Sequence, residues 1–391
     1  MAVLLYSYYP ADPRPRREAE ALAAEGMEVD LLCLSESARQ PEREIINGVR
    51  VHRTRIVRAR RNKRTYVVLY LRFFLTAFWF LSTRGLRRRY DLVHVHNMPD
   101  FLVFAALVPR LRGARVMLDL HDPMPELMAT IQGIKFGPGI IWAARQIERW
   151  SIAFATVVVT PNQAFWRLFV SRSCAPEKVH VILNTPEAEI FTPGASRPAA
   201  PAARDRREFR VMYHGLIRPR HGLDLLVEAV ARVTNEIPAI RLDIYGAHTS
   251  FLDEVLAEAS RLGIGGQVSY HGLKSQAEIA RAIEEADVGV IPNRRTVFTS
   301  INFPTRIFEY LAMGVPVIAP ETEGIRDYFQ PQQLLMFPPG DVGELAARIL
   351  WVNRHPDEAR AVVREGQSVY QQHLWTGEKK RFVELVGRTL G

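Results

Sequence analysis

The stretch FRVMYHGLIRPRHGLDLLVEAVARVTNE, residues Phe209–Glu236, decides the fold of this chain. It begins with an apolar run of strand length that stops at Gly215. It ends with Leu223–Glu236, where apolar residues recur at the spacing of one helix face. A buried strand followed directly by such a helix is the repeating unit of a doubly wound α/β sheet.

The same alternation continues towards the carboxyl terminus. Further short apolar runs lie at Ile240–Gly246, Gln267–Gly272, Asp287–Pro292, Val315–Pro320 and Leu334–Gly340. Runs of this kind are typical of parallel strands that helices cover on both faces. Residues 209–365 therefore predict one Rossmann-like domain, and residues 366–391 predict a helix that packs on its surface.

The amino-terminal half shows the same pattern. Its predicted strands are Ala2–Ser7, Glu28–Leu34, Asp91–Asn97, Arg115–His121, Thr156–Pro161 and Val179–Asn184, and Gly26 closes the first helix. Residues 1–190 thus predict a second Rossmann-like domain. Between the two, residues 191–208 are rich in Pro, Ala and Arg, which indicates a linker. We expect two α/β domains facing a central cleft that holds the ligand.

Composition narrows the class of protein. Of the 391 residues, 24% are charged and 48% are hydrophobic, which is typical of a globular protein. Two cysteines, Cys33 and Cys174, exclude a disulfide framework and favour a reducing compartment. The first residues are those of a core strand and do not form a signal peptide. We therefore expect a cytoplasmic protein.

One segment makes the chain basic. Ile45–Tyr90 contains 13 Arg and Lys residues and no acidic residue, so the rest of the chain has a net charge of −4. Within it, Thr65–Ser82 is strongly apolar but contains Arg72. This pattern favours an interfacial helix on an anionic membrane, and the alternative is a helix packed on its domain. The predicted membrane contacts are Arg58, Arg60, Arg61, Arg64, Phe73 and Trp79.

Two stretches of the second domain contain residues that are suited to binding a diphosphate and a sugar. In Tyr213–Leu226, Gly215 allows close backbone approach, and Arg218 and Arg220 precede a helix, a pattern that suits a diphosphate. In Asn302–Pro320, Arg306 and Glu309 share one helix face, and Glu309 can accept hydrogen bonds from ribose hydroxyls. We also expect the loop that includes Ser300, Asn302 and Phe303 to offer backbone N–H groups. The alternatives are a solvated basic loop and a surface ion pair.

The first domain contains two further stretches with candidate site residues. His121 and Asp122 follow a strand at its ligand-facing end, where a histidine is either structural or part of a site. Arg14 and Arg17 lie near the start of the first helix, where they can meet an anionic acceptor. The Gly-rich dinucleotide fingerprint is absent from this loop.

Together these stretches resemble glycosyltransferase family 4, of the GT-B fold, nearly from end to end. FPTRIFEYLAMGVPVIA, Phe303–Ala319, is the most specific match. The resemblance implies transfer from a nucleotide diphosphate sugar, with retained anomeric configuration and without a metal or other cofactor. It places Glu309 on the donor ribose, Arg218 or Arg220 on the diphosphate, His121 near the transferred sugar, and Gly272 and Leu273 at the base. With them we group Gly215 and Gly246 as donor-binding residues.

Two positions depart from the family pattern. Ile301 stands where many members have a glutamate that contacts the donor sugar, so the identity of the sugar is open. His221 stands where many have a lysine. A neutral histidine cannot supply that charge, and its role is therefore assigned to Arg220.

The predicted function is transfer of a sugar to a hydroxyl of a glycan or lipid-linked acceptor. The expected place is the inner face of the plasma membrane, with the protein peripheral to it. A sugar-nucleotide epimerase of the same fold is one alternative. A basic binding module without catalysis is another, although nucleic acid is not an expected partner because no nucleic-acid motif accompanies the basic segment.

Overall fold

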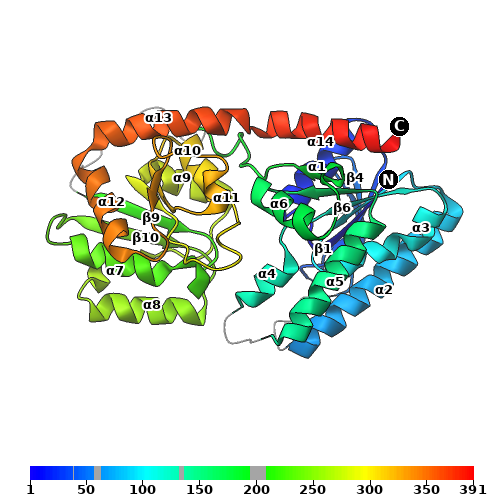
Figure 1. Ribbon diagram of the computed structural model, residues 1–391, viewed down its shortest axis with the longest axis horizontal. Coiled ribbons are helices and arrows are strands. Elements are labelled where there is room, and N and C mark those ends of the chain that lie inside the picture. The colour runs from blue at the N-terminus through cyan, green and yellow to red at the C-terminus, as the bar shows by residue number, and fades with distance from the viewer. Residues whose placement is uncertain (38, 57–62, 132–135, 194–207) are drawn as a thin grey trace. The chain divides into compact units, whose positions relative to one another are not determined.

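A computed structural model of the chain describes residues 1–37, 39–56, 63–131, 136–193 and 208–391, apart from the side chains of residues 63–66. The chain forms two compact units (Figure 1). Met1–Asn184 together with Thr376–Gly391 form the first, which we call the amino-terminal domain. Thr185–Trp375 form the second, the carboxyl-terminal domain. The predicted linker lies mostly outside the described residues.

The amino-terminal domain is built on an eight-stranded sheet in the order β3-β4-β2-β1-β5-β6-β7-β8. All neighbours pair in parallel except β3 and β4. The strands are β1 (Ala2–Tyr8), β2 (Val29–Leu34), β3 (Arg43–Ile46), β4 (Val49–Thr54), β5 (Leu92–His96), β6 (Arg115–Asp119), β7 (Val157–Thr160) and β8 (Val179–Val181). The helices are α1 (Pro13–Ala24), α2 (Lys63–Arg87), α3 (Leu107–Leu111), α4 (Met124–Ala129), α5 (Pro138–Phe154), α6 (Gln163–Arg172) and α14 (Trp375–Leu390).

The antiparallel edge of this sheet was not predicted. Asn47 and Gly48 join β3 to β4, and both have positive φ, of 47° and 81°. Two consecutive residues with positive φ form the tight hairpin turn that Asn-Gly favours. The start of the basic segment is therefore a hairpin on the sheet edge.

The carboxyl-terminal domain has a six-stranded parallel sheet in the order β11-β10-β9-β12-β13-β14. Its strands are β9 (Phe209–His214), β10 (Ile240–Tyr245), β11 (Val268–Tyr270), β12 (Val288–Val290), β13 (Val317–Pro320) and β14 (Leu335–Phe337). Its helices are α7 (Leu223–Val233), α8 (Ser250–Arg261), α9 (Gln276–Glu285), α10 (Arg306–Ala312), α11 (Glu323–Arg326), α12 (Val342–Arg354) and α13 (Pro356–Gln372). Two doubly wound α/β domains, as predicted, are confirmed.

The end of the chain differs from the single helix predicted at 366–391. It forms α13 and α14, and α14 belongs to the amino-terminal domain. There Phe382, Leu385 and Val386 join the core that also contains Val3 and Leu31. The Glu378 carboxylate accepts a hydrogen bond of 3.0 Å from the Leu183 backbone N–H. Apolar burial and this buried hydrogen bond hold α14 on its domain.

Helix α2 packs on the domain along one narrow stripe. Phe73, Ala77 and Leu81 are fully buried, and the Phe73 ring lies edge-on to Tyr6 with centroids 5.2 Å apart. Phe73, predicted to contact the membrane, is therefore a core residue. Trp79, in contrast, is 70% exposed.

The packing of Tyr310 against Gly289 gives a stability prediction. A Cβ at Gly289 in β12 would lie within 2.4 Å of Tyr310 ring atoms, and this ring is fully buried. Gly289→Ala should lower the free energy of unfolding by about 1–3 kcal/mol because the ring must shift. A Cβ at Gly377 in α14 would meet nothing within 4 Å. Gly377→Ala should raise stability by about 0.5–1 kcal/mol. Denaturant unfolding of both variants checks this, and equal effects would contradict it.

Candidate functional site

Three predicted glycines come together at the carboxyl ends of β9, β10 and β11. The Gly246 N–H donates to the Gly272 carbonyl at 2.9 Å, and a Cβ on Gly246 would lie 2.3 Å from the Gly215 carbonyl oxygen. Gly215 and Gly272 have positive φ, of 124° and 76°. The backbone can follow this path only without side chains. These glycines have no side chain that would cover the carboxyl ends of the strands, so the backbone can approach a ligand closely.

Helix α10 places Arg306 and Glu309 at the carboxyl end of β9. The Arg306 Nη1 donates to the His214 carbonyl, and its guanidinium lies 5.2 Å from the centroid of the Tyr213 ring. Glu309 Oε2 lies 3.3 Å from His214 Nε2. Both side chains therefore project from one helix face towards the end of β9, as their spacing predicted.

Two buried histidines at or just after the end of β9, His214 and His221, remain neutral. Burial, reinforced by Arg306, lowers the pKa of His214 well below its ordinary value. Burial together with Arg306 and Arg220 lowers the pKa of His221 to about 3. His221 therefore carries no charge here, and the positive charge of the turn between β9 and α7 comes from arginines.

Arg218 and Arg220 flank Pro219 in that turn. Arg218 is exposed, and Arg220 is half-buried with its guanidinium carbon 5.9 Å from the centroid of the Phe298 ring. Gly222 then starts α7 with a φ of 65°, and a Cβ there would lie 2.0 Å from the Pro292 carbonyl oxygen. The turn thus holds two cations close to the start of a helix, a favourable setting for an anion.

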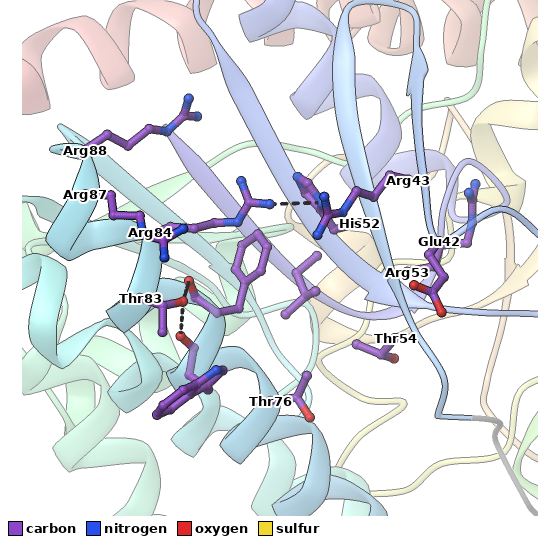
Figure 2. A pocket seen from close by; sticks show the side chains of 13 residues that line it. Glu42, Arg43, His52, Arg53, Thr54, Thr76, Thr83, Arg84, Arg87 and Arg88 are labelled. Atoms are coloured by element: carbon purple, nitrogen blue, oxygen red, sulfur yellow. Dashed lines mark hydrogen bonds between the residues drawn. The ribbon is translucent and has the colours of Figure 1, made fainter.

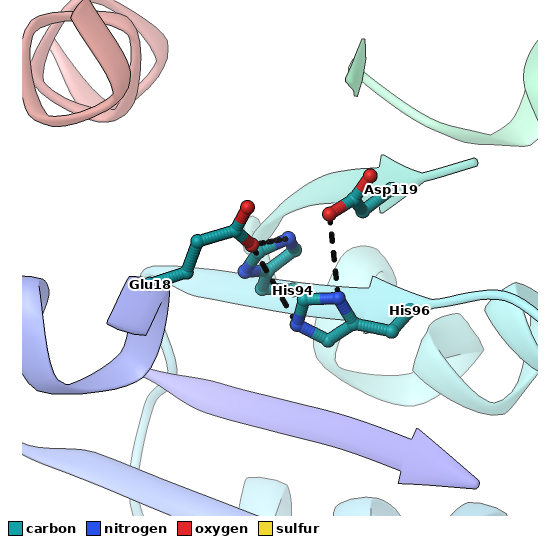
Figure 3. A group of neighbouring side chains, drawn as sticks. All are labelled: Glu18, His94, His96 and Asp119. Atoms are coloured by element: carbon teal, nitrogen blue, oxygen red, sulfur yellow. Dashed lines mark ion pairs between the residues drawn. The ribbon is translucent and has the colours of Figure 1, made fainter. Parts of the chain in front are cut away.

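The amino-terminal domain gathers a second group of titratable residues around His121, and Figure 3 shows two of them, His96 and Asp119. His121 Nε2 lies 3.0 Å from His96 Nδ1 and 3.3 Å from Asp119 Oδ2. The His121 backbone N–H donates to Asn97 Oδ1 at 2.8 Å, and Asn97 Nδ2 donates to the Asp122 carbonyl. His121 keeps 23% of its side chain exposed, whereas Asp119 and His96 are fully buried. The buried residues hold the imidazole of His121 at the surface of the domain.

Arg14 is buried in this group rather than exposed to an acceptor. Its Nε and Nη2 donate to the two oxygens of Asp119 at 3.0 and 2.9 Å, and Nη1 donates to the Ile182 carbonyl. Burial alone would raise the pKa of Asp119, but Arg14, aided by His121 and His96, outweighs it and holds the pKa well below its usual value. Arg17, which is also buried, donates to Asn184 Oδ1 at 2.7 Å. The role predicted for Arg14 at an exposed acceptor site is corrected to that of a buried counter-ion.

Glu18, His94, His96 and Asp119 also form a set of potential metal ligands. One ligand atom from each lies within 4.8 Å of the others. Burial raises the pKa of Glu18 well above its ordinary value and lowers the pKa of His94 well below it. Sequence reasoning missed this group, although His94 and His96, two apart in a strand, necessarily share a face. Asp119 already binds Arg14 through both oxygens.

Two family models match the chain, one for each domain. Residues 11–185 match the model of the glycosyl transferase 4-like domain, and residues 208–355 match that of the glycosyl transferases group 1. The chain is 24% identical to a D-inositol 3-phosphate glycosyltransferase of Jonesia denitrificans, over 95% of this chain and 89% of the relative. In some other relatives of the same name the match spans about a third of their length.

This chain belongs to glycosyltransferase family 4. Its fold matches sucrose-phosphate synthase from Thermosynechococcus elongatus, with a TM-score of 0.80, 20% identity, and coverage of 99% of this chain and 98% of that one. It also matches Anabaena HepE in complex with UDP-glucose, with a TM-score of 0.72, 16% identity, and 99% coverage of both. The fold is thus GT-B, and the enzyme is a glycosyltransferase. These relatives give the epimerase alternative no support.

In this glycosyltransferase the loop before α10 differs from the prediction that its N–H groups meet a ligand. The N–H groups of Ser300, Ile301 and Asn302 donate to the carbonyls of Thr296 and Phe298. The Thr299 N–H donates to the Thr296 hydroxyl at 3.0 Å. These four amides close a turn and are already satisfied.

The side chains around this loop lie in different surroundings. The Phe303 ring is buried, with centroids 5.0 Å from Phe308 and 4.8 Å from Tyr328. Ser300 and Asn302 are half-buried. Leu273, which follows Gly272 after β11, is 77% exposed. Ser300 and Asn302 are thus the predicted loop residues that still reach solvent.

The side chains of the predicted basic membrane contacts are not among those that the structure describes. Arg58, Arg60 and Arg61 lie outside the described residues, as does the side chain of Arg64. The exposed residues of α2 instead include Val67, Leu71, Leu75 and Trp79. Among the described helices, α2 is the one long and apolar enough to cross a membrane by length and composition.

Neutral His221 predicts how stability depends on pH. Its folded pKa lies below its unfolded value, so the unfolded chain binds the proton first as pH falls. The stability it contributes is complete above about pH 6.5 and is lost below it. Between pH 7.5 and 5.5 the loss should be about 1.3 kcal/mol. His221→Gln should remove this part of the pH dependence in denaturant unfolding, and exposed His248→Gln should not. An unchanged profile for His221→Gln would contradict the neutral state.

Proposed function

We propose that this glycosyltransferase moves a sugar from a nucleotide diphosphate donor to a hydroxyl of a glycan or lipid-linked acceptor, with retention of anomeric configuration. The proposal rests on the arrangement of residues at the carboxyl end of β9. There the open glycine backbone, the carboxylate of Glu309 and the cations Arg218 and Arg220 are brought together within one domain. An open backbone, a hydrogen-bond acceptor and fixed cations are what a nucleoside diphosphate requires.

Each group has a distinct task in this proposal. Glu309, 15% exposed and close to neutral His214, accepts hydrogen bonds from the ribose hydroxyls. Arg218 and Arg220 bind the diphosphate, and backbone around Gly272 and Leu273 meets the base. Anabaena HepE, of the same fold, was solved with UDP-glucose, which supports a donor of this class.

The reaction requires stabilisation of a leaving group. The bond between the anomeric carbon and the phosphate oxygen breaks, and negative charge builds up on the diphosphate. Fixed arginine charges at that point lower the barrier. The acceptor oxygen attacks from the same face, and its proton passes to the departing phosphate. We propose that His121, held by Asp119 and His96, contacts the transferred sugar, and that the transfer needs no metal.

Arg220→Ala tests the role assigned to the leaving group. Removing one fixed charge that stabilises developing negative charge should reduce kcat about 10²–10³-fold, and the melting temperature should change little. Arg232→Ala is the matched control, because Arg232 forms an exposed pair with Glu228 on α7 of the same domain. Turnover and the anomeric configuration of the product, followed by NMR, are the measurements. An active Arg220→Ala enzyme, or an inverted product, would contradict the proposal.

We propose further that the enzyme works at the inner face of the plasma membrane. The stripe of α2 formed by Val67, Leu71, Leu75 and Trp79 is exposed, and only 17% of the most apolar part of the helix is buried. Basic residues lie before and after it in the sequence. An apolar helix face flanked by arginines is suited to the boundary of an anionic leaflet.

Flotation with vesicles that contain anionic lipid tests the membrane proposal. Leu75→Ser/Trp79→Ser should reduce the vesicle-bound fraction several-fold, because it removes exposed apolar area from α2. Leu273→Ser, at an exposed leucine of the other domain, is the control and should float like the wild type. Wild-type protein that fails to float, or a double variant that floats unchanged, would remove the basis for this location.

A further inference from the structure

A pocket of about 560 Å³ lies between α2 and the β3–β4 hairpin in the amino-terminal domain (Figure 2). Arg84 and Arg87 at the end of α2 and Arg88 directly after it approach the pocket from one side, and Arg43 lies across from them on the hairpin. Arg53 completes a set of five arginines, against a single acidic lining residue, Glu42. None of these residues belongs to the donor site or to the group around His121.

Two of the five arginines are already neutralised. Arg53 pairs with Glu44 and donates to the carbonyls of Tyr9 and Pro41. Arg88 pairs with Asp30 and Glu28. Their positive charge is therefore matched by carboxylates outside the pocket.

The positive charges of the other three arginines are not balanced by carboxylates in the described part of the chain. Among the residues that the structure describes, Arg43, Arg84 and Arg87 form no ion pair with a carboxylate. Arg84 lies 3.5 Å from His52 Nδ1 and over the Phe80 ring. Glu42 pairs with Arg55, so it does not neutralise them. The pocket thus has an excess of about three positive charges.

The rest of the lining contains both polar and apolar residues. Its apolar side chains are Leu32, Trp79 and Phe80, and they adjoin the exposed face of α2 at Trp79. Trp79 lines the pocket and is also 70% exposed on the helix surface. Phe80 lines the wall beside it, and Ile45 on the hairpin is 72% exposed. A ligand with a charged head and an apolar tail would find both surfaces side by side.

We propose that this pocket binds the phosphate or diphosphate end of a membrane lipid whose chain lies along the apolar face of α2. A terminal phosphate carries a charge of about −1.5 to −2 at neutral pH, and a diphosphate carries more. Three unmatched arginines complement these charges better than the single charge of a phosphodiester headgroup. Arginine also binds phosphate oxygens in pairs. The inference rests on the proposed membrane location of α2 and names the chemistry of the lipid.

Binding of farnesyl monophosphate to the full chain, measured by titration calorimetry below its micelle-forming concentration, tests the pocket. Wild-type protein should bind it at least tenfold more tightly than farnesol, inorganic phosphate or dihexanoyl phosphatidylglycerol. Arg43→Gln/Arg87→Gln should lose at least tenfold in affinity, because charged hydrogen bonds are lost. Both side chains are exposed, so the melting temperature should be retained.

Arg112→Gln/Arg115→Gln is the matched control, because it removes two exposed arginines from the same domain. Its affinity should stay within about twofold of the wild type, less than half a kcal/mol. Equal binding of inorganic phosphate would assign the pocket to free phosphate, and equal binding of the phosphatidylglycerol would assign it to a phosphodiester headgroup. Either result, or full affinity in Arg43→Gln/Arg87→Gln, would overturn the proposal. If wild type binds no farnesyl phosphate yet still transfers sugar, only this inference fails and the proposed function stands.

Discussion

The contact between Arg306 and the carbonyl of His214 is the interaction on which the donor site depends. It fixes α10 against the end of β9, and the same histidine lies 3.3 Å from Glu309. Gly215 leaves room for this contact, since a Cβ there would lie 3.0 Å from Arg306 Nη1. Burial keeps His214 neutral, so the cationic guanidinium and the carboxylate meet no competing charge from the ring. One helix face and one glycine thereby set the positions of the groups assigned to the donor.

In the amino-terminal domain, the important interaction is between two buried charges, those of Arg14 and Asp119. Arg14 binds both oxygens of Asp119, and this pair lies beneath His96 and His121. Removing one partner of a buried pair leaves an uncompensated charge, which destabilises a protein strongly. We therefore assign the pair to the placement of His121 and not to contact with the acceptor. The lipid pocket and the stripe of α2 lie in this domain as well, which makes it the domain that meets the acceptor in our account.

Much of this arrangement could be predicted from the sequence, because strand and helix periodicity is local. The two sheets, the glycines at their ends and the shared face of Arg306 and Glu309 follow from such patterns. The hairpin at Asn47–Gly48 has an equally local turn signal, the Asn-Gly pair, although no antiparallel strand was predicted there.

Features that depend on tertiary contacts could not be predicted in this way. The amides before α10 are satisfied by Thr296 and Phe298, which only the folded loop shows. Arg14 meets Asp119 across 105 residues of chain, and α14 reaches Leu183 across 195. Spacing along the sequence carries no information about partners so far apart.

The central claim is that the end of β9 holds a nucleotide diphosphate sugar through Glu309. The most direct measurement is thermal unfolding of the full chain with a panel of uridine, guanosine and thymidine diphosphate sugars. We expect that one donor, at 100 times its Kd, stabilises the native state by about 2.7 kcal/mol, and that Glu309→Ala abolishes the shift. No shift with any donor, or an equal shift in Glu309→Ala, would contradict it.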